Sequence, residues 1–191
     1  PKLLESRGGL LGVFEQAHVK DVLAFLRLCE NAKDNIAFTR LLGMLRGVGP
    51  KTVETWWQKL GNRFDSTDVQ QRQALTQLMR SSAMEEWRTI DETFAAYHRE
   101  KLGDQGNVAI QRFCEAFYSN HLARTYENAE KRIEDLEELQ SQIIRSTDVA
   151  TFLSDVALLT NVDHQYTRQA HGEQQTDEVL LSTVHQAKGL E

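Results

Sequence analysis

Apolar residues recur every three or four positions over most of this chain, with polar residues between them. This spacing places the apolar side chains on one face of a helix and predicts a series of amphipathic helices. The predicted core stripes are Val19, Val22, Leu26 and Cys29; Phe38, Leu41, Leu42 and Leu45; Val53, Trp56, Trp57 and Leu60; Leu75, Leu78 and Met79; Trp87, Ile90, Phe94 and Tyr97; Ile110, Phe113, Cys114 and Phe117; Ala129, Ile133, Leu136, Leu139 and Ile143; and Val149, Phe152, Leu153, Val156 and Leu159.

Polar residues that favour helix starts precede several of these stripes. We expect N-caps at Asp34, Thr67 and Asn107 and within Ser146-Thr147-Asp148, and a capping box formed by Ser82 and Glu85. Glu127 and Lys131 are spaced for an ion pair on the helix predicted over residues 127–145. Residues 161–177 form the one long polar stretch of the chain and are typical of a linker or mobile loop.

The segment Arg46-Gly-Val-Gly-Pro-Lys-Thr52 joins two of the predicted helices. Helix, Gly-x-Gly hairpin, helix is the outline of a helix-hairpin-helix contact to a phosphate. The glycines let a phosphate approach the backbone, and the free amides at the start of the second helix attract an anion. Arg46 and Lys51 add positive charge. Such a device recognises phosphates and not bases; the alternative is an ordinary tight turn, with a glycine C-cap followed by a proline.

The same segment superficially resembles the phosphate loop of ATPases, but it lacks that loop's glycines. A phosphate loop has a glycine immediately before its lysine and another five positions earlier. Pro50 and Leu45 occupy these positions. A strand should also precede a phosphate loop, whereas a helix is predicted here. We therefore exclude a phosphate loop at this position.

The charge is distributed unevenly along the chain. The net charge is −6, but residues 1–60 carry +3 and the remainder carries −9. A contact with DNA, if the hairpin makes one, should therefore be local and lie near residues 40–60.

No apolar run approaches the ~18–20 residues of a membrane span. The two cysteines, Cys29 and Cys114, are expected to be reduced residues on apolar helix faces.

The chain closes with a short apolar run over residues 179–184, which is typical of a buried strand of a parallel sheet. A polar turn with His185, Lys188 and Gly189 follows. Turns at the carboxyl ends of such strands are where α/β sheets place ligand contacts. Because a domain rarely ends inside such a unit, we expect the chain to be cut from a larger protein.

The last nine residues resemble motif V of the UvrD/Rep-type superfamily 1 DNA helicases, Thr-x-His-x-x-Lys-Gly-Leu-Glu; here they are Thr183-Val-His-Gln-Ala-Lys-Gly-Leu-Glu191. Two further segments match in the family's order. Gly8 to Arg27 resembles the passage from the second motor domain into the inserted 2B domain. Arg46 to Thr52 resembles the 2B element with its Gly-Ile-Gly hairpin. The departures are His18, where the family more often has Glu, and Val48 in place of Ile.

The resemblance implies a mainly α fold: a multi-helix 2B-type insertion domain with a helix-hairpin-helix-like element, and short terminal strand pieces of a RecA-like α/β domain. Residues 1–12 would be the junction with motor domain 2A, and residues 13–160 the helical 2B domain. Residues 161–177 would be a linker, and residues 178–191 the strand and motif V of motor domain 2A. We expect about two-thirds helix, with strand only at the termini.

The resemblance also assigns site residues. Duplex DNA would meet Arg46, Gly47, Val48, Gly49, Lys51 and Thr52. Thr183 and His185 would contact the single strand. Glu191 would accept a hydrogen bond from the ribose of ATP, and Lys188 and Gly189 would shape the loop between the two ligands.

The implied parent protein is a bacterial, cytoplasmic, ATP-dependent DNA helicase that moves 3′ to 5′ and uses ATP and Mg²⁺. Its partners would be duplex and single-stranded DNA, its own remaining motor domains and DNA repair proteins. This stretch lacks the phosphate loop, the Mg²⁺-binding carboxylates and the arginines of a phosphoryl-transfer site. We therefore expect no catalytic residue, metal site, cofactor or ATPase activity in the stretch alone.

Two other functions remain open from the residues. One is a non-enzymatic helix-hairpin-helix DNA-binding module of a repair protein. The other is a regulatory protein-interaction domain, because inserted domains of this family also act as regulators.

Overall fold

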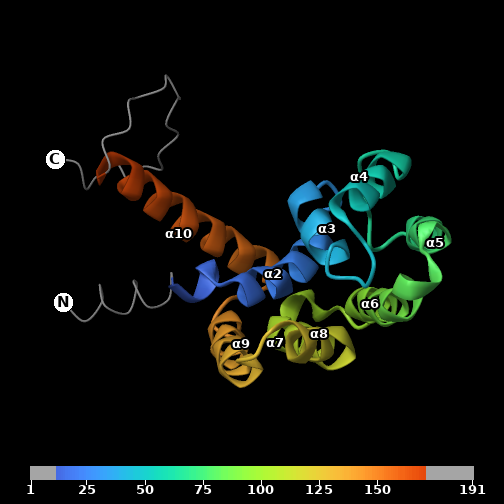
Figure 1. Cartoon of the computed structure of the whole chain (residues 1–191). Coiled ribbons are helices and arrows are strands. Elements are labelled where there is room, and N and C mark those ends of the chain that lie inside the picture. Colours follow the sequence, from blue (N-terminus) through green and yellow to red (C-terminus); the bar gives the residue numbers. More distant parts are fainter. Residues whose placement is uncertain (1–11, 171–191) are drawn as a thin grey trace. The chain divides into compact units, whose positions relative to one another are not determined.

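The structure, a computed structural model, describes residues 12–170, which form helices and turns and no strand (Figure 1). After a helical turn over residues 12–15, the α-helices are α2 (Ala17–Glu30), α3 (Asn35–Leu42), α4 (Pro50–Lys59), α5 (Val69–Leu78), α6 (Ser81–Arg99), α7 (Gly106–Phe113), α8 (Ser119–Thr125), α9 (Ala129–Ile143) and α10 (Val149–Ala170). A 3-10 turn, η1 (Leu102–Asp104), precedes α7, and a π-helical turn, η2 (Cys114–Tyr118), joins α7 to α8. The prediction of a mainly α fold is confirmed; the strand pieces expected at the ends lie outside the described residues.

The chain divides into two compact units, Pro1–Thr160 and Asn161–Glu191. Helix α10 begins in the first unit and continues to Ala170. Residues 161–170, predicted to belong to a linker or mobile loop, are therefore helical. Their polar composition does not oppose this, because the propensity cost of polar residues in a helix is small.

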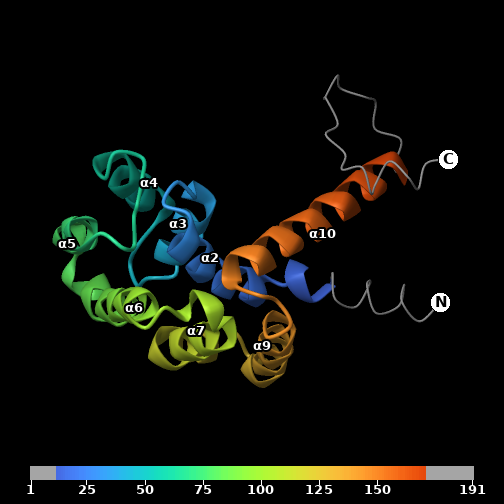
Figure 2. The ribbon, with the colours of Figure 1, turned by 180° about the vertical axis from the view of Figure 1, so that it is seen from behind.

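Helix α2 lies at the centre of the first unit, between α3 on one side and α7 and α9 on the other (Figures 1 and 2). Ten of its 14 residues are buried. Phe25, which is fully buried, stacks on Phe113 of α7 with ring centroids 4.4 Å apart and lies 5.0 Å from Phe94 of α6. Each such side chain contributes about 1.5–3 kcal/mol by burial, so α2 organises the apolar core.

A second group of aromatic side chains extends this core towards α3 and α4. Its centre is Phe64, in the loop after α4, which contacts Phe38, Trp87 and Phe94 with ring centroids 5.7–6.1 Å apart. The Phe64 backbone N–H donates to the carbonyl of Ala32 at 2.8 Å, which holds the loop against the core. Because Phe64 belongs to no helical stripe, the periodicity of the sequence did not identify it.

Nearly all predicted stripe residues are buried or half-buried, but Ile133 is 41% exposed. The buried residues of α9 are Leu136, Leu139 and Ile143. The first turns of α9 make polar contacts with α2 instead, so the apolar stripe is shorter than predicted. Glu127 forms no ion pair with Lys131, because α9 begins after Glu127.

Two of the N-cap predictions are confirmed. The Asp34 carboxylate accepts from the Ala37 N–H at 2.9 Å, and the Asp148 carboxylate accepts from the Thr151 N–H at 2.7 Å.

Both free cysteines also lie where expected, Cys29 buried and Cys114 half-buried. Burial raises the pKa of the Cys114 thiol to about 12.

Three other cap predictions are wrong. The Thr67 hydroxyl donates to Asp65, and Asp68 caps α5 instead. Helix α6 starts before Ser82, so Ser82 and Glu85 form no capping box. Helix α7 starts at Gly106, where close packing against Ile143 and Val149 fixes the start, rather than after an Asn107 cap.

Asp21 on α2 is a buried carboxylate with partners on two other elements. Its oxygens accept from Arg40 Nη1 of α3 and from the Tyr118 hydroxyl of η2, each at 2.7 Å. Burial and the nearby Asp21 charge raise the pKa of Tyr118, which remains a hydrogen-bond donor. A buried carboxylate needs such partners to offset the cost of its desolvation, so Asp21 fixes α3 and η2 relative to α2.

His18 on α2 is 1% exposed and lies between two side chains of α9. Its Nε2 contacts Asp135 Oδ2 at 2.8 Å, and its Nδ1 contacts Arg132 Nη1 at 2.8 Å. A guanidinium can only donate, so Nδ1 is the acceptor and Nε2–H donates to Asp135. Burial, together with the Arg132 charge, outweighs the attraction of Asp135 and lowers the pKa of His18. The folded protein therefore holds His18 neutral.

This lowered pKa makes the free energy of unfolding depend on pH. The unfolded state takes up a proton as the pH falls below about 6.5, the ordinary histidine pKa, while the folded state resists it. Stability is therefore present above that pH and is lost as the pH falls further. The variant His18→Gln keeps an amide donor for Asp135 and an oxygen acceptor for Arg132 but does not titrate. Urea unfolding at pH 7.5 and 5.5 should show a smaller acid loss for His18→Gln than for wild type; equal losses would contradict the assignment.

Gly106 provides a test of the packing between α7, α9 and α10. A Cβ there would lie 2.7 Å from Ile143 Cγ1 and 3.0 Å from Val149 Cγ2. Gly106→Ala should lower the free energy of unfolding by about 1–3 kcal/mol through overpacking, measured by urea denaturation. Gly12→Ala is the control, because no atom lies within 4 Å of its Cβ position. A Gly106→Ala protein as stable as the control would contradict this packing.

Candidate nucleic-acid interface

The hairpin lies between α3 and α4. Helix α3 ends at Leu42, and hydrogen bonds from Met44 to Leu41 and from Leu45 to Leu42, both 3.2 Å, replace the helical pattern. The prediction that this helix continues through Leu45 is therefore wrong. Leu45 is nevertheless 3% exposed, because turns with this hydrogen-bond spacing keep it on the buried side.

The two hairpin glycines have different roles. Gly47 has a φ of +71°, a left-handed conformation that favours glycine, and a Cβ there would lie 3.2 Å from the Ser82 hydroxyl. Gly49 has φ −98° and ψ 168°, which any residue can adopt, and caps α4 with Pro50 in the first turn. No atom lies within 4 Å of the Gly49 Cβ position. Gly47 is thus needed for the turn, whereas Gly49 leaves the backbone open to a ligand.

Several backbone donors of the hairpin remain available. The amides of Thr52 and Val53 donate to the Gly49 carbonyl at 3.0 and 3.2 Å. The amides of Gly47, Gly49 and Lys51 have no acceptor among the described residues. Unpaired amides at the start of a helix carry partial positive charge, so this end of α4 is suited to an anion.

Apolar side chains hold the hairpin on the core while its backbone faces solvent. Leu45 and Val53 are buried on either side of it, and Val48 packs partly against the same core. Lys51 is exposed and forms no ion pair among the described residues, and Thr52 is half-buried in the first turn of α4. The structure thus brings together the hairpin residues that the sequence singled out, with their backbone outward.

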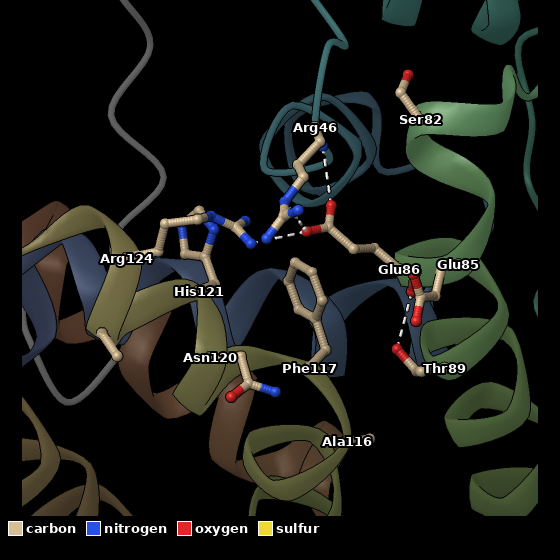
Figure 3. Close-up of a pocket in the computed structure, with 11 residues that line it drawn as sticks. Arg46, Ser82, Glu85, Glu86, Thr89, Ala116, Phe117, Asn120, His121 and Arg124 are labelled. Atoms are coloured by element: carbon tan, nitrogen blue, oxygen red, sulfur yellow. Dashed lines mark hydrogen bonds and ion pairs between the residues drawn. The ribbon is translucent and has the colours of Figure 1, made fainter.

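Arg46 differs from the expectation of a free charge, because Glu86 of α6 holds it. The Glu86 Oε2 atom accepts from the Arg46 backbone N–H at 2.8 Å, and Oε1 lies 3.1 Å from Arg46 Nε. The same Oε1 accepts from Arg124 Nη1 of α8 at 2.9 Å (Figure 3). Sequence reasoning missed Glu86 and Arg124, which lie far from the hairpin along the chain and stand out by no motif.

A groove of about 530 Å³ opens beside the hairpin, lined by Arg46, Glu85, Glu86, Phe117, His121 and Arg124 among others (Figure 3). Its walls come from α6 and from η2 with α8. The π-helical turn shifts the register of the residues that follow it, and such turns are often found at functional sites. Phe117, His121 and Arg124 then recur at helical spacing along one wall.

His121 has the one buried side-chain nitrogen or oxygen atom, Nδ1, without a hydrogen-bond partner in the part of the chain that the structure describes. Its ring stacks on Phe117 and Tyr118 with centroids 5.7 and 5.6 Å away. Burial lowers the pKa of His121 despite the opposing effect of Asp21. The ring is therefore neutral near pH 7 and adds no charge to the groove.

The other predicted site residues, Thr183, His185, Lys188, Gly189 and Glu191, lie outside the described residues. Within residues 12–170, no group of three or more His, Cys, Asp or Glu side chains is arranged to hold a metal ion. Across the same residues, no helix combines the length and apolar character that crossing a membrane requires.

The sequence has relatives among bacterial helicases. It is 27% identical to the ATP-dependent DNA helicase PcrA of Bacillus subtilis, over 93% of this chain and 25% of that protein. It is 28% identical to DNA helicase II of Haemophilus influenzae, over 96% of this chain and 26% of that protein. The chain thus spans about a quarter of the length of these relatives. No solved structure matches it.

The profile of the UvrD-like helicase C-terminal domain matches residues 9–191, which is nearly the whole chain. The similarity to this family is therefore not confined to the terminal and hairpin segments but extends through the helices between them. The chain belongs to the UvrD-like helicase C-terminal domain family.

Proposed function

We propose that this chain is part of an ATP-dependent DNA helicase and binds the backbone of duplex DNA through the hairpin from Arg46 to Thr52. The observation behind the proposed DNA contact is the exposed hairpin backbone: within residues 12–170 the amides of Gly47, Gly49 and Lys51 have no acceptor, and no atom lies within 4 Å of the Gly49 Cβ position. An anion can approach these amides without meeting a side chain. The proposed reaction, ATP-dependent unwinding of DNA, is taken from relatives that are named as ATP-dependent DNA helicases.

The contact should be weak and indifferent to sequence. The hairpin offers amides and Lys51, which has no ion pair among the residues that the structure describes, and none of these groups distinguishes one base pair from another. The net charge of −6 opposes DNA approach. In the parent helicase, the hairpin would hold the duplex while the motor domains move along the single strand.

The remaining roles rest on the family resemblance. Thr183 and His185 would contact single-stranded DNA, and Glu191, with Lys188 and Gly189, would contact ATP. The residues divide as a 2A junction over 1–12, a 2B domain over 13–160, a linker over 161–177 and motif V over 178–191. ATP and Mg²⁺ would bind between motor domains of the parent, and this stretch alone would hydrolyse no ATP.

The names of the relatives favour a helicase over a non-enzymatic DNA-binding module or a regulatory domain. Both the helicase and the non-enzymatic DNA-binding module would use the hairpin contact, so a DNA-binding assay on the 191-residue chain tests this contact but does not distinguish the two functions. Hydrolysis of ATP by the full-length protein tests the reaction.

Replacing Gly49 tests the hairpin. In Gly49→Val, the extended backbone accepts valine and the side chain enters open space, so the fold loses only a glycine cap, at about 1 kcal/mol. The side chain would keep a phosphate from the amides. Duplex binding, measured by fluorescence anisotropy, should weaken about ten- to hundredfold, as expected for lost hydrogen bonds to a charged group.

The control for Gly49→Val is Thr55→Val, which places the same side chain at an exposed position further along α4. Thr55→Val should bind duplex DNA like wild type. If a folded Gly49→Val protein also binds like wild type, the hairpin is only a turn and the proposed contact fails.

Lys51→Ala tests the charge at the hairpin. Loss of one phosphate contact should reduce affinity and lower the slope of log K against log salt by about one unit. Lys59→Ala makes the same change of net charge about 12 Å further along α4 and should leave the slope near the wild-type value. Equal slopes for the two variants would show that Lys51 contributes only to the overall charge.

A further inference from the structure

The groove beside the hairpin contains a cation, Arg124, to which neither the family resemblance nor the proposed hairpin contact gives a role. Arg124 belongs to α8, and it meets the hairpin only through Glu86 of α6. Arg46 and Arg124 both contact the same oxygen, Glu86 Oε1, at 3.1 and 2.9 Å. The two guanidinium groups therefore lie side by side and share one carboxylate (Figure 3).

The trio of Arg46, Glu86 and Arg124 has an unbalanced positive charge, because two arginines share one carboxylate. The carboxylate is the most buried of the three: the Glu86 side chain is 15% exposed, against 63% for Arg46 and 36% for Arg124. Glu85, the other carboxylate lining the groove, lies beside Thr89 and away from the guanidinium groups in Figure 3. The exposed part of the trio is therefore cationic.

The guanidinium groups retain donors for a further ligand. Each has five N–H groups and no acceptor, so a ligand must supply acceptor oxygens, and a negative charge suits it best. Paired arginines bind the oxygens of a phosphate by forked hydrogen bonds. Because Arg46 also begins the hairpin, such a site would be continuous with the unpaired amides of Gly47 and Gly49.

The local backbone explains how Arg124 reaches this place. The π-helical turn over Cys114–Tyr118 changes the register of the helix that continues as α8. Tyr118 anchors that turn through its hydrogen bond to Asp21. Phe117 and His121 then line the groove below Arg124. Arg124 is thus positioned by a helix, α8, and not by a loop.

We propose that Arg124 is a second contact for the phosphate backbone of duplex DNA, reached from the hairpin through Arg46 and positioned by Glu86. The proposal rests on the proposed function, because the hairpin supplies the rest of the bound strand. Glu86 holds the two arginines together, and it also competes with the phosphate for their donors.

The test compares Arg124→Ala with Arg112→Ala in the 191-residue chain, using fluorescence anisotropy with a short duplex of mixed sequence over a salt series. Arg112 is the matched control, because it also pairs with a glutamate, Glu100, at 2.7 Å and has similar exposure. Glu100 directly follows the end of α6 and is 14 residues beyond Glu86, which is about 21 Å at the rise of a helix.

Arg124→Ala should weaken duplex binding about tenfold and lower the salt slope by about one unit, as expected for one charged phosphate contact. Arg112→Ala should change the duplex affinity and the salt slope much less. Equal effects of the two substitutions would overturn the proposal, because they would show a response to net charge alone. Circular dichroism melting of both variants verifies that each is folded.

Glu86→Gln separates a direct phosphate contact from an indirect effect on the hairpin. If Arg124 binds phosphate, removing the competing charge should leave binding at least as tight as in wild type. If Arg124 only holds Glu86 in place beneath the hairpin, Glu86→Gln should weaken binding as Arg124→Ala does, and that result would overturn the proposal.

The two proposals fail separately. Loss of binding in Gly49→Val, with Arg124→Ala behaving like Arg112→Ala, would remove the Arg124 contact and leave the hairpin contact standing. Normal binding in Gly49→Val, with a selective loss in Arg124→Ala, would move the DNA contact from the hairpin to the groove.

Discussion

The structure depends on the burial of α2, a helix covered on nearly all sides that carries a buried imidazole, His18, and a buried carboxylate, Asp21. A helix can be buried all round when its residues are apolar, but a buried carboxylate or imidazole needs partners with correct geometry. The partners of Asp21 are Arg40 and Tyr118, and those of His18 come from α9. Apolar packing brings the helices together, and these polar contacts fix the position of each neighbouring element along α2.

This constraint on α2 extends to the candidate interface. The Arg40 contact holds α3, from which the hairpin emerges, and the Tyr118 contact holds the π-helical turn, from which α8 emerges. One buried carboxylate therefore positions the hairpin and one wall of the groove together. Glu86 adds the third element by connecting α6 to both arginines. A surface that bound phosphate would need such support, because contacts with water and salt would not order it.

The chemistry of this surface suits a helicase that must hold a duplex without recognising its sequence. In the proposed contact, backbone amides and arginines would bind the repeating phosphates, and none of them would read a base edge. A modest, salt-sensitive contact also lets the protein release one position and take the next, whereas tight binding would oppose movement. The acidic remainder of the chain limits affinity in the same direction.

The sequence by itself determined the helices, because helical periodicity and capping chemistry are local properties. The stripe of α2 and the caps at Asp34 and Asp148 followed from residues close together in the chain. The hairpin was also predictable, since glycine permits backbone angles that other residues avoid and proline fixes φ at its own position. The terminal motif, which is a feature of nine consecutive residues, also indicated the helicase family.

Only the tertiary structure decided which polar residues meet. Glu86 joins Arg46 and Arg124 across 40 and 38 residues, and His18 meets Asp135 across 117. The start of α7 at Gly106, which packs against Ile143 and Val149, and the burial of the loop residue Phe64 likewise depend on neighbours distant in sequence. Periodicity shows which face of a helix is buried, but the partner of a buried or paired charge depends on how whole helices pack. That packing placed Arg124 beside the hairpin.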